Sequence, residues 1–108
     1  MTSDMTMIKE SQLFKTIKDA KENLGFTLLL DITAIDNLNK AHPSSTRFEL
    51  VYVLRHSSFE NTMIFKVAVE EPEIGVATVS SLFSSADWAE REVYDQYGIN
   101  FIGHPTLK

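Results

Sequence analysis

The chain has 108 residues, a formal net charge of −5, 44% hydrophobic and 23% charged residues, and no cysteine. These values are typical of a globular protein in one domain, residues 1–108, which buries roughly 65% of the surface that the unfolded chain exposes. The lack of cysteine excludes disulfides and thiolate-ligated zinc or iron–sulfur clusters. The negative charge argues against general binding to nucleic acid or to anionic lipid.

The start of the chain has neither the basic segment nor the apolar run of a signal peptide. No apolar run approaches the roughly 20 residues that span a bilayer. We therefore expect a cytoplasmic protein without direct membrane insertion. Residues 1–7 are expected to form a frayed end.

The first predicted helix begins at Ile8 or Ser11 and runs to Leu24. Apolar residues recur along it at helical spacing, which favours one buried face. These residues are Leu13, Ile17, Ala20 and Leu24. Charged residues occupy the other face, and Gly25 is expected to end the helix.

The next predicted element is a buried strand, because Phe26–Ile32 is almost continuously apolar. Asp31 and Asp36 lie near its end. Paired carboxylates could act in acid–base chemistry or bind a metal, but aspartate at the end of a strand more often caps a turn, and we favour that structural role. The polar connection from 36 to 46 is expected to be a mobile loop, with His42 as a surface residue rather than a metal ligand.

Two alternating segments follow, and they predict an antiparallel pair of strands joined by a hairpin loop at 57–61. One face of the pair is strongly apolar, and the first helix is its natural cover. That face consists of Phe48, Leu50, Tyr52 and Leu54 from the first strand and Met63, Phe65, Val67 and Val69 from the second. Apolar residues on the opposite face indicate that it is partly covered as well, namely Val51, Val53, Ile64 and Ala68.

The acidic run Glu70–Glu73 predicts a solvated turn, and a helical turn is expected at about Val79–Phe83. The expected fold class is therefore α+β. It has two layers, with a mixed or antiparallel sheet of about four to five strands packed by helices.

The final helix is predicted to begin near Ser84 and to end at Gly98. Ser84 or Ser85 can act as the N-cap, with Asp87 completing a weak capping box. Gly98 suits the C-cap because glycine tolerates positive φ. The buried stripe of this helix is expected to consist of Ala89, Val93 and Tyr97.

Two interpretations compete for the charges of this helix. In the first, the helix is a solvated surface, on which Arg91 faces carboxylates four residues away on each side in pairs worth only about 0.3–0.5 kcal/mol each. In the second, the helix is held against a partner, with Glu90, Arg91 and Glu92 in fixed pairs. Trp88, the only tryptophan, favours the second interpretation, because Trp, Tyr and Arg are enriched at interface hot spots.

Residues 90–105 read EREVYDQYGINFIGHP. This stretch, called here the signature segment, closely resembles the signature of the C subunit, also known as the 30 kDa subunit, of proton-pumping NADH:quinone oxidoreductase (respiratory complex I). Every fixed position of that signature is filled. Leu30–Asp36 and Arg47–Leu54 resemble the same family more loosely, so that the resemblance extends from about Leu13 to the end of the chain.

The resemblance implies an accessory subunit of the hydrophilic arm, with no flavin, cluster, metal or active site of its own. Such a protein docks on the quinone-side D subunit while electrons pass from NADH to quinone, and it lies at the cytoplasmic face of the inner membrane through the complex. Together with Trp88, the residues expected to form the fold-and-docking signature are Glu90, Arg91, Glu92, Tyr94, Asp95, Tyr97, Gly98, Phe101, Gly103, His104 and Pro105.

Alternatives stay open. The domain also resembles part of membrane-bound nickel–iron hydrogenases of the formate hydrogenlyase type, whose large subunit would then be the partner, and a free-standing interaction module is a further possibility. The family usually continues into a basic tail where this chain ends at Lys108, so that a short form of the domain is expected. A self-contained enzyme has the least support, because no P-loop, G-x-S-x-G or H-E-x-x-H motif occurs. His104 could carry protons near neutral pH, but a turn histidine bonded to the backbone is the simpler interpretation.

Overall fold

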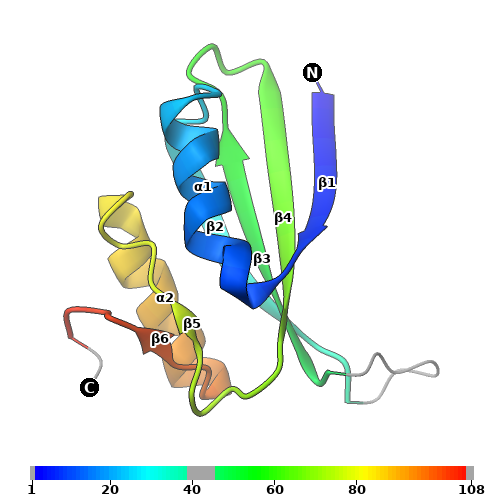
Figure 1. Cartoon of the computed structure of the whole chain (residues 1–108), viewed down its shortest axis with the longest axis vertical. Helices are drawn as coiled ribbons and strands as arrows, with labels where there is room; N and C mark the ends of the chain where they lie inside the picture. The colour runs from blue at the N-terminus through cyan, green and yellow to red at the C-terminus, as the bar shows by residue number, and fades with distance from the viewer. Residues whose placement is uncertain (1, 39–45, 107–108) are drawn as a thin grey trace.

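The computed structural model describes residues 2–38 and 46–106. Within these ranges the main sheet is mixed, with strand order β1-β4-β3-β2. Its strands are β1 (Thr2–Ile8), β2 (Leu28–Asp36), β3 (Phe48–Arg55) and β4 (Asn61–Val69). Two helices, α1 (Leu13–Glu22) and α2 (Ser84–Tyr97), cover one face of the sheet, and a small second sheet pairs β5 (Val76–Ala77) with β6 (Phe101–Ile102) in parallel (Figure 1). The expected two-layer α+β fold is confirmed.

The predicted hairpin of β3 and β4 is confirmed, with antiparallel pairing from Phe48↔Val69 to Arg55↔Thr62. The alternating residues of β3 that were expected to face a helix are all buried, and they join the buried residues of α1 in one hydrophobic core. On the opposite face Val51, Val53 and Ile64 are half-buried among their sheet neighbours, and no described helix lies on that face. Alternation is a local signal, which explains why this part of the fold could be predicted.

The expectation of a frayed N-terminus is wrong. β1 pairs in parallel with β4, from Thr2↔Asn61 to Ile8↔Val67, and forms one edge of the sheet. The partner that orders this segment lies about 60 residues away in sequence, so that no local pattern announces it. Met5 remains more than half exposed.

The first helix is shorter than expected. A 3-10 turn (Glu10–Gln12) precedes α1, and Leu13 and Ile17 are fully buried as expected. Leu24 is instead 49% exposed, because the helix has already ended before it. None of the described helices is long and apolar enough to cross a membrane.

The expectation of a buried strand at Phe26–Ile32 is also wrong in part. The strand begins later, at Leu28, and it lies at the edge of the sheet. Leu28 and Leu30 are 38% and 48% exposed, and Ile32 is its one residue classed as fully buried. The register shifts between Leu29 and Asp31, which marks a β-bulge at this edge.

The connection from β4 to α2 passes through a turn in which Ile74 and Gly75 both donate to the carbonyl of Glu71. Gly75 has a φ of 88°, and a Cβ at this position would lie 1.9 Å from the carbonyl oxygen of Asn100. Only glycine therefore allows the two strands of the small sheet to come together here. The helical turn expected before α2 is present, because the carbonyl of Val79 accepts the N–H groups of residues 82 and 83.

Candidate functional site

The N-terminus of α2 is capped differently from the expectation. Phe83, rather than Ser84 or Ser85, is the N-cap residue, with an extended backbone and no side-chain cap. Asp87 does not complete a capping box, because its carboxylate lies 3.1 Å from Nε2 of His104. The Asp87 carboxylate is therefore engaged in a tertiary contact rather than in a local cap.

The C-terminus of α2 is as expected. Gly98 is the C-cap, with a φ of 73°, and its N–H donates to the carbonyl of Tyr94 at 2.8 Å. The chain then turns back, with Ile99 and Phe101 buried, and β6 pairs with β5. The signature segment therefore covers the second half of α2 and all of β6, which pairs with the strand that precedes α2.

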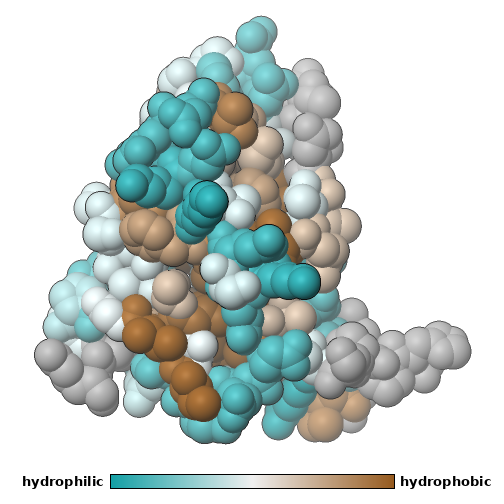
Figure 2. Space-filling model, viewed as in Figure 1, coloured by the Kyte–Doolittle hydropathy of each residue, from teal (hydrophilic) through white to brown (hydrophobic). Residues whose placement is uncertain are grey.

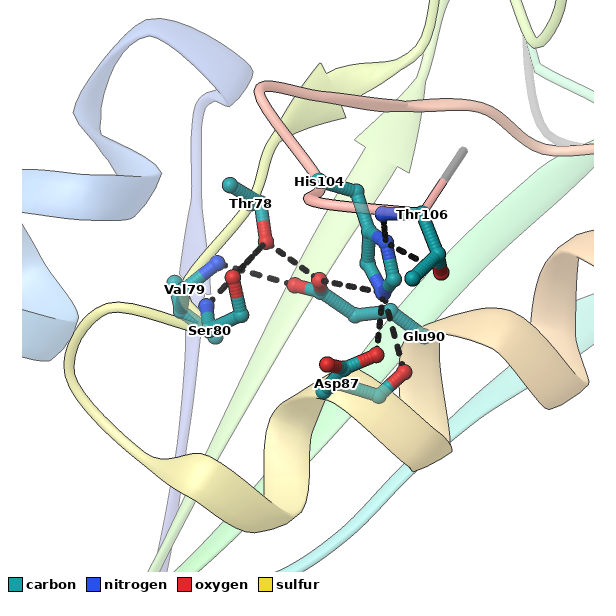
Figure 3. Close-up of polar contacts among 7 residues, drawn as sticks. All are labelled: Thr78, Val79, Ser80, Asp87, Glu90, His104 and Thr106. Carbon is teal, nitrogen blue, oxygen red and sulfur yellow. Dashed lines mark hydrogen bonds and ion pairs between the residues drawn. The ribbon is translucent and has the colours of Figure 1, made fainter. Parts of the chain in front are cut away.

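Glu90 points into the domain and has no exposed surface. The Thr78 hydroxyl donates to Oε1 of Glu90, and the Val79 N–H donates to Oε2 at 2.8 Å (Figure 3). The Thr78 oxygen in turn accepts the N–H of Ser80 at 3.1 Å. The first glutamate of the signature segment thus ties α2 to the segment that follows β5.

Burial raises the pKa of the Glu90 carboxyl, because removal from water penalises the charged form; the bonds from Thr78 and Val79 and the nearby His104 ring act in the opposite direction. Nε2 of His104 lies 4.0 Å from Oε1 of Glu90. On β3, burial and the Glu90 charge raise the pKa of Tyr52 well above its usual value. The Tyr52 hydroxyl has no hydrogen-bond partner among the described residues.

His104 holds the other side of this cluster and is only 3% exposed. Its Nδ1 accepts the backbone N–H of Thr106 at 3.1 Å, which assigns the ring proton to Nε2. Nε2 lies 2.9 Å from the Asp87 carbonyl, to which it donates (Figure 3). The expected turn histidine, bonded to backbone, is confirmed.

The opposite side of α2 faces solvent. Trp88 is 69% exposed and Tyr94 is 39% exposed, and Arg91 is exposed between them. Of the ion pairs formed by the described residues, none joins Arg91 to Asp87 or Asp95, so that the predicted ladder of charges is absent. A long exposed side chain gains little from such pairs and stays hydrated.

The residues of the predicted docking signature therefore separate into two groups. Glu90, Phe101 and His104 lie inside the domain, and Tyr97 is half-buried with its ring edge-on to Phe48 at 5.9 Å. The others lie at the surface, namely Trp88, Arg91, Glu92, Tyr94, Asp95, Gly98, Gly103 and Pro105. The signature segment therefore has buried residues that hold the domain together and exposed residues that face solvent.

The inward position of Glu90 was not expected from the sequence. The fully buried positions of α2 are Ala86, Glu90 and Val93, while Ala89 and Tyr97 are only partly buried. A usable signal was present, because Glu90 stands four residues after one apolar position and three before the next, which is the spacing of a buried stripe. Nothing local identified Thr78 as its partner.

A groove of 330 Å³ lies between α2 and β2. The strand contributes Asp31 to Ala34, and the helix contributes side chains that include Trp88, Glu92 and Gln96. The groove brings together two stretches, Leu30–Asp36 and the signature segment, that are 54 residues apart at their closest in sequence. Asp31 and Asp36 do not act as a pair, because Asp36 instead accepts bonds from Arg47 at 3.0 and 3.1 Å and from the Leu38 N–H at 3.0 Å.

The structural role expected for Asp36 is confirmed by these bonds, and the Arg47 side chain lowers the pKa of its carboxyl. In residues 2–38 and 46–106, no group of three or more His, Cys, Asp or Glu side chains is placed to hold a metal ion. His42 and most of the connection that was expected to be mobile lie outside the described residues.

Comparison with known proteins identifies the relatives of this chain. The family model described as "Respiratory-chain NADH dehydrogenase, 30 Kd subunit" matches residues 6–108. A protein of Geobacter sulfurreducens, named as the C subunit of an NADH-quinone oxidoreductase, is 40% identical over 88 residues, covering 82% of this chain and 52% of that protein. One of Hydrogenobaculum, named as the C/D subunit of an NADH-quinone oxidoreductase, is 34% identical over 100 residues, covering 93% of this chain and 16% of that protein.

A solved structure, described as Nqo5 of a trypsin-resistant fragment, has the same fold with a TM-score of 0.85 and 33% identity, covering 97% of this chain and 83% of that one. The chain spans about half the length of the Geobacter relative. The filled signature, the matching fold and the family match over nearly the whole chain agree. The chain belongs to the family of the 30 kDa subunit of respiratory-chain NADH dehydrogenase.

Proposed function

We propose that this chain is an accessory subunit of the hydrophilic arm of NADH:quinone oxidoreductase. It docks on the quinone-side D subunit and supports electron transfer from NADH to quinone without carrying electrons itself. The observation that carries the proposal is the exposed side of α2, where Trp88 is 69% exposed beside Arg91 and Glu92. Tryptophan, tyrosine and arginine are the residue types most enriched among the anchors of protein interfaces.

The choice of the D subunit as the partner is supported by the Hydrogenobaculum relative, whose name joins C and D in one protein. This chain matches only 16% of that relative. The rest of that relative is long enough to contain a D subunit that is joined covalently to the C subunit. Docking on the D subunit would also bring the chain to the cytoplasmic face of the membrane through the complex.

The Geobacter and Hydrogenobaculum relatives carry the name of NADH oxidoreductases, which favours this assignment over the hydrogenase alternative. Glu90 and His104 are buried, so that neither side chain is accessible to a partner and their contacts stabilise the domain itself. Docking would then depend on the exposed positions alone. No catalytic role is assigned to any of them.

The test is affinity purification of the tagged chain from its native host, with mass spectrometry of the proteins recovered. Recovery of the D subunit and other arm subunits is expected, and Arg91→Glu should lower that recovery far more than it lowers the free energy of unfolding, because Arg91 is exposed and makes no ion pair within the described residues. Lys15→Glu on the exposed face of α1 is the matched control. Recovery of a hydrogenase large subunit, or of the chain alone, would contradict the proposal.

A further inference from the structure

We propose that the groove between α2 and β2 receives an extended, positively charged segment of the partner protein, which adds as a strand to the free edge of β2. This rests on the proposed function, in that the segment belongs to the D subunit. It adds where the contact lies and what chemistry recognises it.

The free backbone edge is the first observation. Among the described strands, β2 is the last of the main sheet and pairs only with β3. The groove is lined by four consecutive β2 residues, Asp31 to Ala34. Side chains of consecutive strand residues point to opposite faces, so that what these four share is the outer backbone edge. That edge offers N–H and C=O groups to an incoming strand.

The second observation is that the described part of this edge is protected only near its start, by the bulge between Leu29 and Asp31. Exposed edges in native proteins are commonly blunted by lysine or proline. From Leu28 to Asp36 the strand has neither, and Leu28 and Leu30 are 38% and 48% exposed along it. Beyond the bulge, the regular edge from Asp31 to Asp36 has the backbone geometry that pairs with another strand. Trp88 lines the same groove and is exposed, so that a bound segment would bury its ring.

The negative charge of the groove favours a positively charged partner segment. Asp31 and Glu92 line the groove, and no lysine or arginine among the described residues does. Arg47 already neutralises Asp36 at the end of the strand, which leaves the negative charge concentrated at the groove. A second copy of this chain would bring a further net charge of −5, which opposes self-association. A strand added at this edge has side chains on both faces of the sheet. On the α2 face an arginine or lysine meets Glu92 and the Trp88 ring, on which a guanidinium can stack, and on the other face a neighbouring basic residue lies beside Asp31, which pairs with Val53.

Other exposed apolar surfaces do not carry the same assignment. Figure 2 shows hydrophobic surface in the region of β5 and β6. Ile102 in β6 is 53% exposed, and Ile74, two residues before β5, is 54% exposed. The strands beside that patch have only two residues each, so that they offer little backbone edge to an incoming strand. The α2–β2 groove combines a free strand edge, apolar lining residues and a defined charge.

The experiment uses Trp88 as its reporter, because the chain has one tryptophan. The full chain is titrated with the intact D subunit, and with peptides of about 15 residues tiled across the D sequence, while tryptophan emission is recorded. A basic peptide should bind and shift the emission to shorter wavelength. Methylation of its backbone nitrogens at alternate positions should abolish binding in one phase of the alternation and leave it intact in the other, as strand pairing requires.

Charge reversals complete the test. Glu92→Arg and Asp31→Arg should each weaken binding of the intact D subunit and of that peptide about tenfold. Glu60→Arg, which makes the same change of net charge in the exposed loop between β3 and β4, should leave both affinities unchanged. Circular dichroism of each variant confirms that the fold is retained.

The other outcomes separate the two proposals. Binding of the intact D subunit without an emission change, and with Glu92→Arg equal to Glu60→Arg, would overturn the groove assignment and leave the proposed docking partner standing. No binding of the D subunit at all would overturn both. An emission shift that depends only on the concentration of the chain itself would identify a second copy as the occupant and overturn the groove assignment.

Discussion

Glu90 and Glu92 stand two residues apart on α2, and their surroundings are opposite. Glu90 is fully buried and accepts hydrogen bonds from Thr78 and Val79, whereas Glu92 is exposed at the groove beside Trp88. The helical repeat is the reason, because two residues turn the side chain by more than half a revolution. One short charged stretch can therefore hold its own domain together on one side and present a surface to a partner on the other.

Removal of the internal carboxylate should have the largest effect. Glu90→Ala leaves a cavity and an unpaired Val79 N–H, so that the free energy of unfolding should fall by about 3 kcal/mol. Glu92→Ala, on the exposed side, should change it by less than about 0.5 kcal/mol. Urea denaturation measures both, and equal losses would erase the distinction between the two sides.

Truncation of the exposed Trp88 side chain should lower the affinity for the partner and leave the free energy of unfolding almost unchanged. Trp88→Ala removes a side chain that is 69% exposed, so that stability should change by less than about 0.5 kcal/mol. Affinity for the D subunit should fall about tenfold or more, because exposed tryptophans are frequent hot spots. Isothermal titration calorimetry with the purified partner measures this, with Phe59→Ala in the exposed hairpin loop as control. A loss of stability without a loss of affinity would reverse the assignment.

The titration of Glu90 should be visible in the pH dependence of stability. Burial raises its pKa in the folded state, so that its stabilising contribution is complete below the pKa of the unfolded chain and is lost as pH rises through the folded value. Relative to Glu90→Gln, the natural chain should therefore lose stability as pH rises from below the ordinary carboxyl pKa to neutral and alkaline values, by no more than about 1.4 kcal/mol per pH unit. Denaturation of both proteins across this range is the measurement. A difference that grows in favour of the natural chain as pH rises would contradict the raised pKa.

The smallest effect concerns Tyr52. Its hydroxyl is buried without a partner among the described residues. Tyr52→Phe should therefore leave stability unchanged or increase it by up to about 1 kcal/mol. A loss above about 1 kcal/mol in thermal or urea unfolding would show that the hydroxyl has a partner near Glu90.

The local part of the fold could be predicted from the sequence, and the long-range part could not. Alternation identified β3 and β4, and glycine at residue 98 identified the end of α2, because both signals lie within a few residues. β1 was missed, since its ordering depends on β4. The apolar run before Asp31 was assigned to the interior, although an apolar edge strand that awaits a partner has the same composition.

The candidate site was predictable to a similar degree. The signature segment was identified by its residues, and Trp88 was expected at a surface. The division between its inward and outward residues was not, because the partners of Glu90 and His104 come from other parts of the chain. The capping serines were predicted on local grounds, but the N-cap residue is Phe83, and Asp87 contacts His104 from a distant part of the chain.

Hydrogen–deuterium exchange of the chain, free and bound to the D subunit, tests the central claim most directly. Docking through the outward side predicts new protection of the β2 edge at residues 28–36 and of the chain around Trp88, while the β1 edge at residues 2–8 exchanges as before. The Val79 N–H, which donates to the buried Glu90 carboxylate, should already be protected from exchange in the free chain. Protection that appears at β1 and leaves β2 and α2 unchanged would contradict the account.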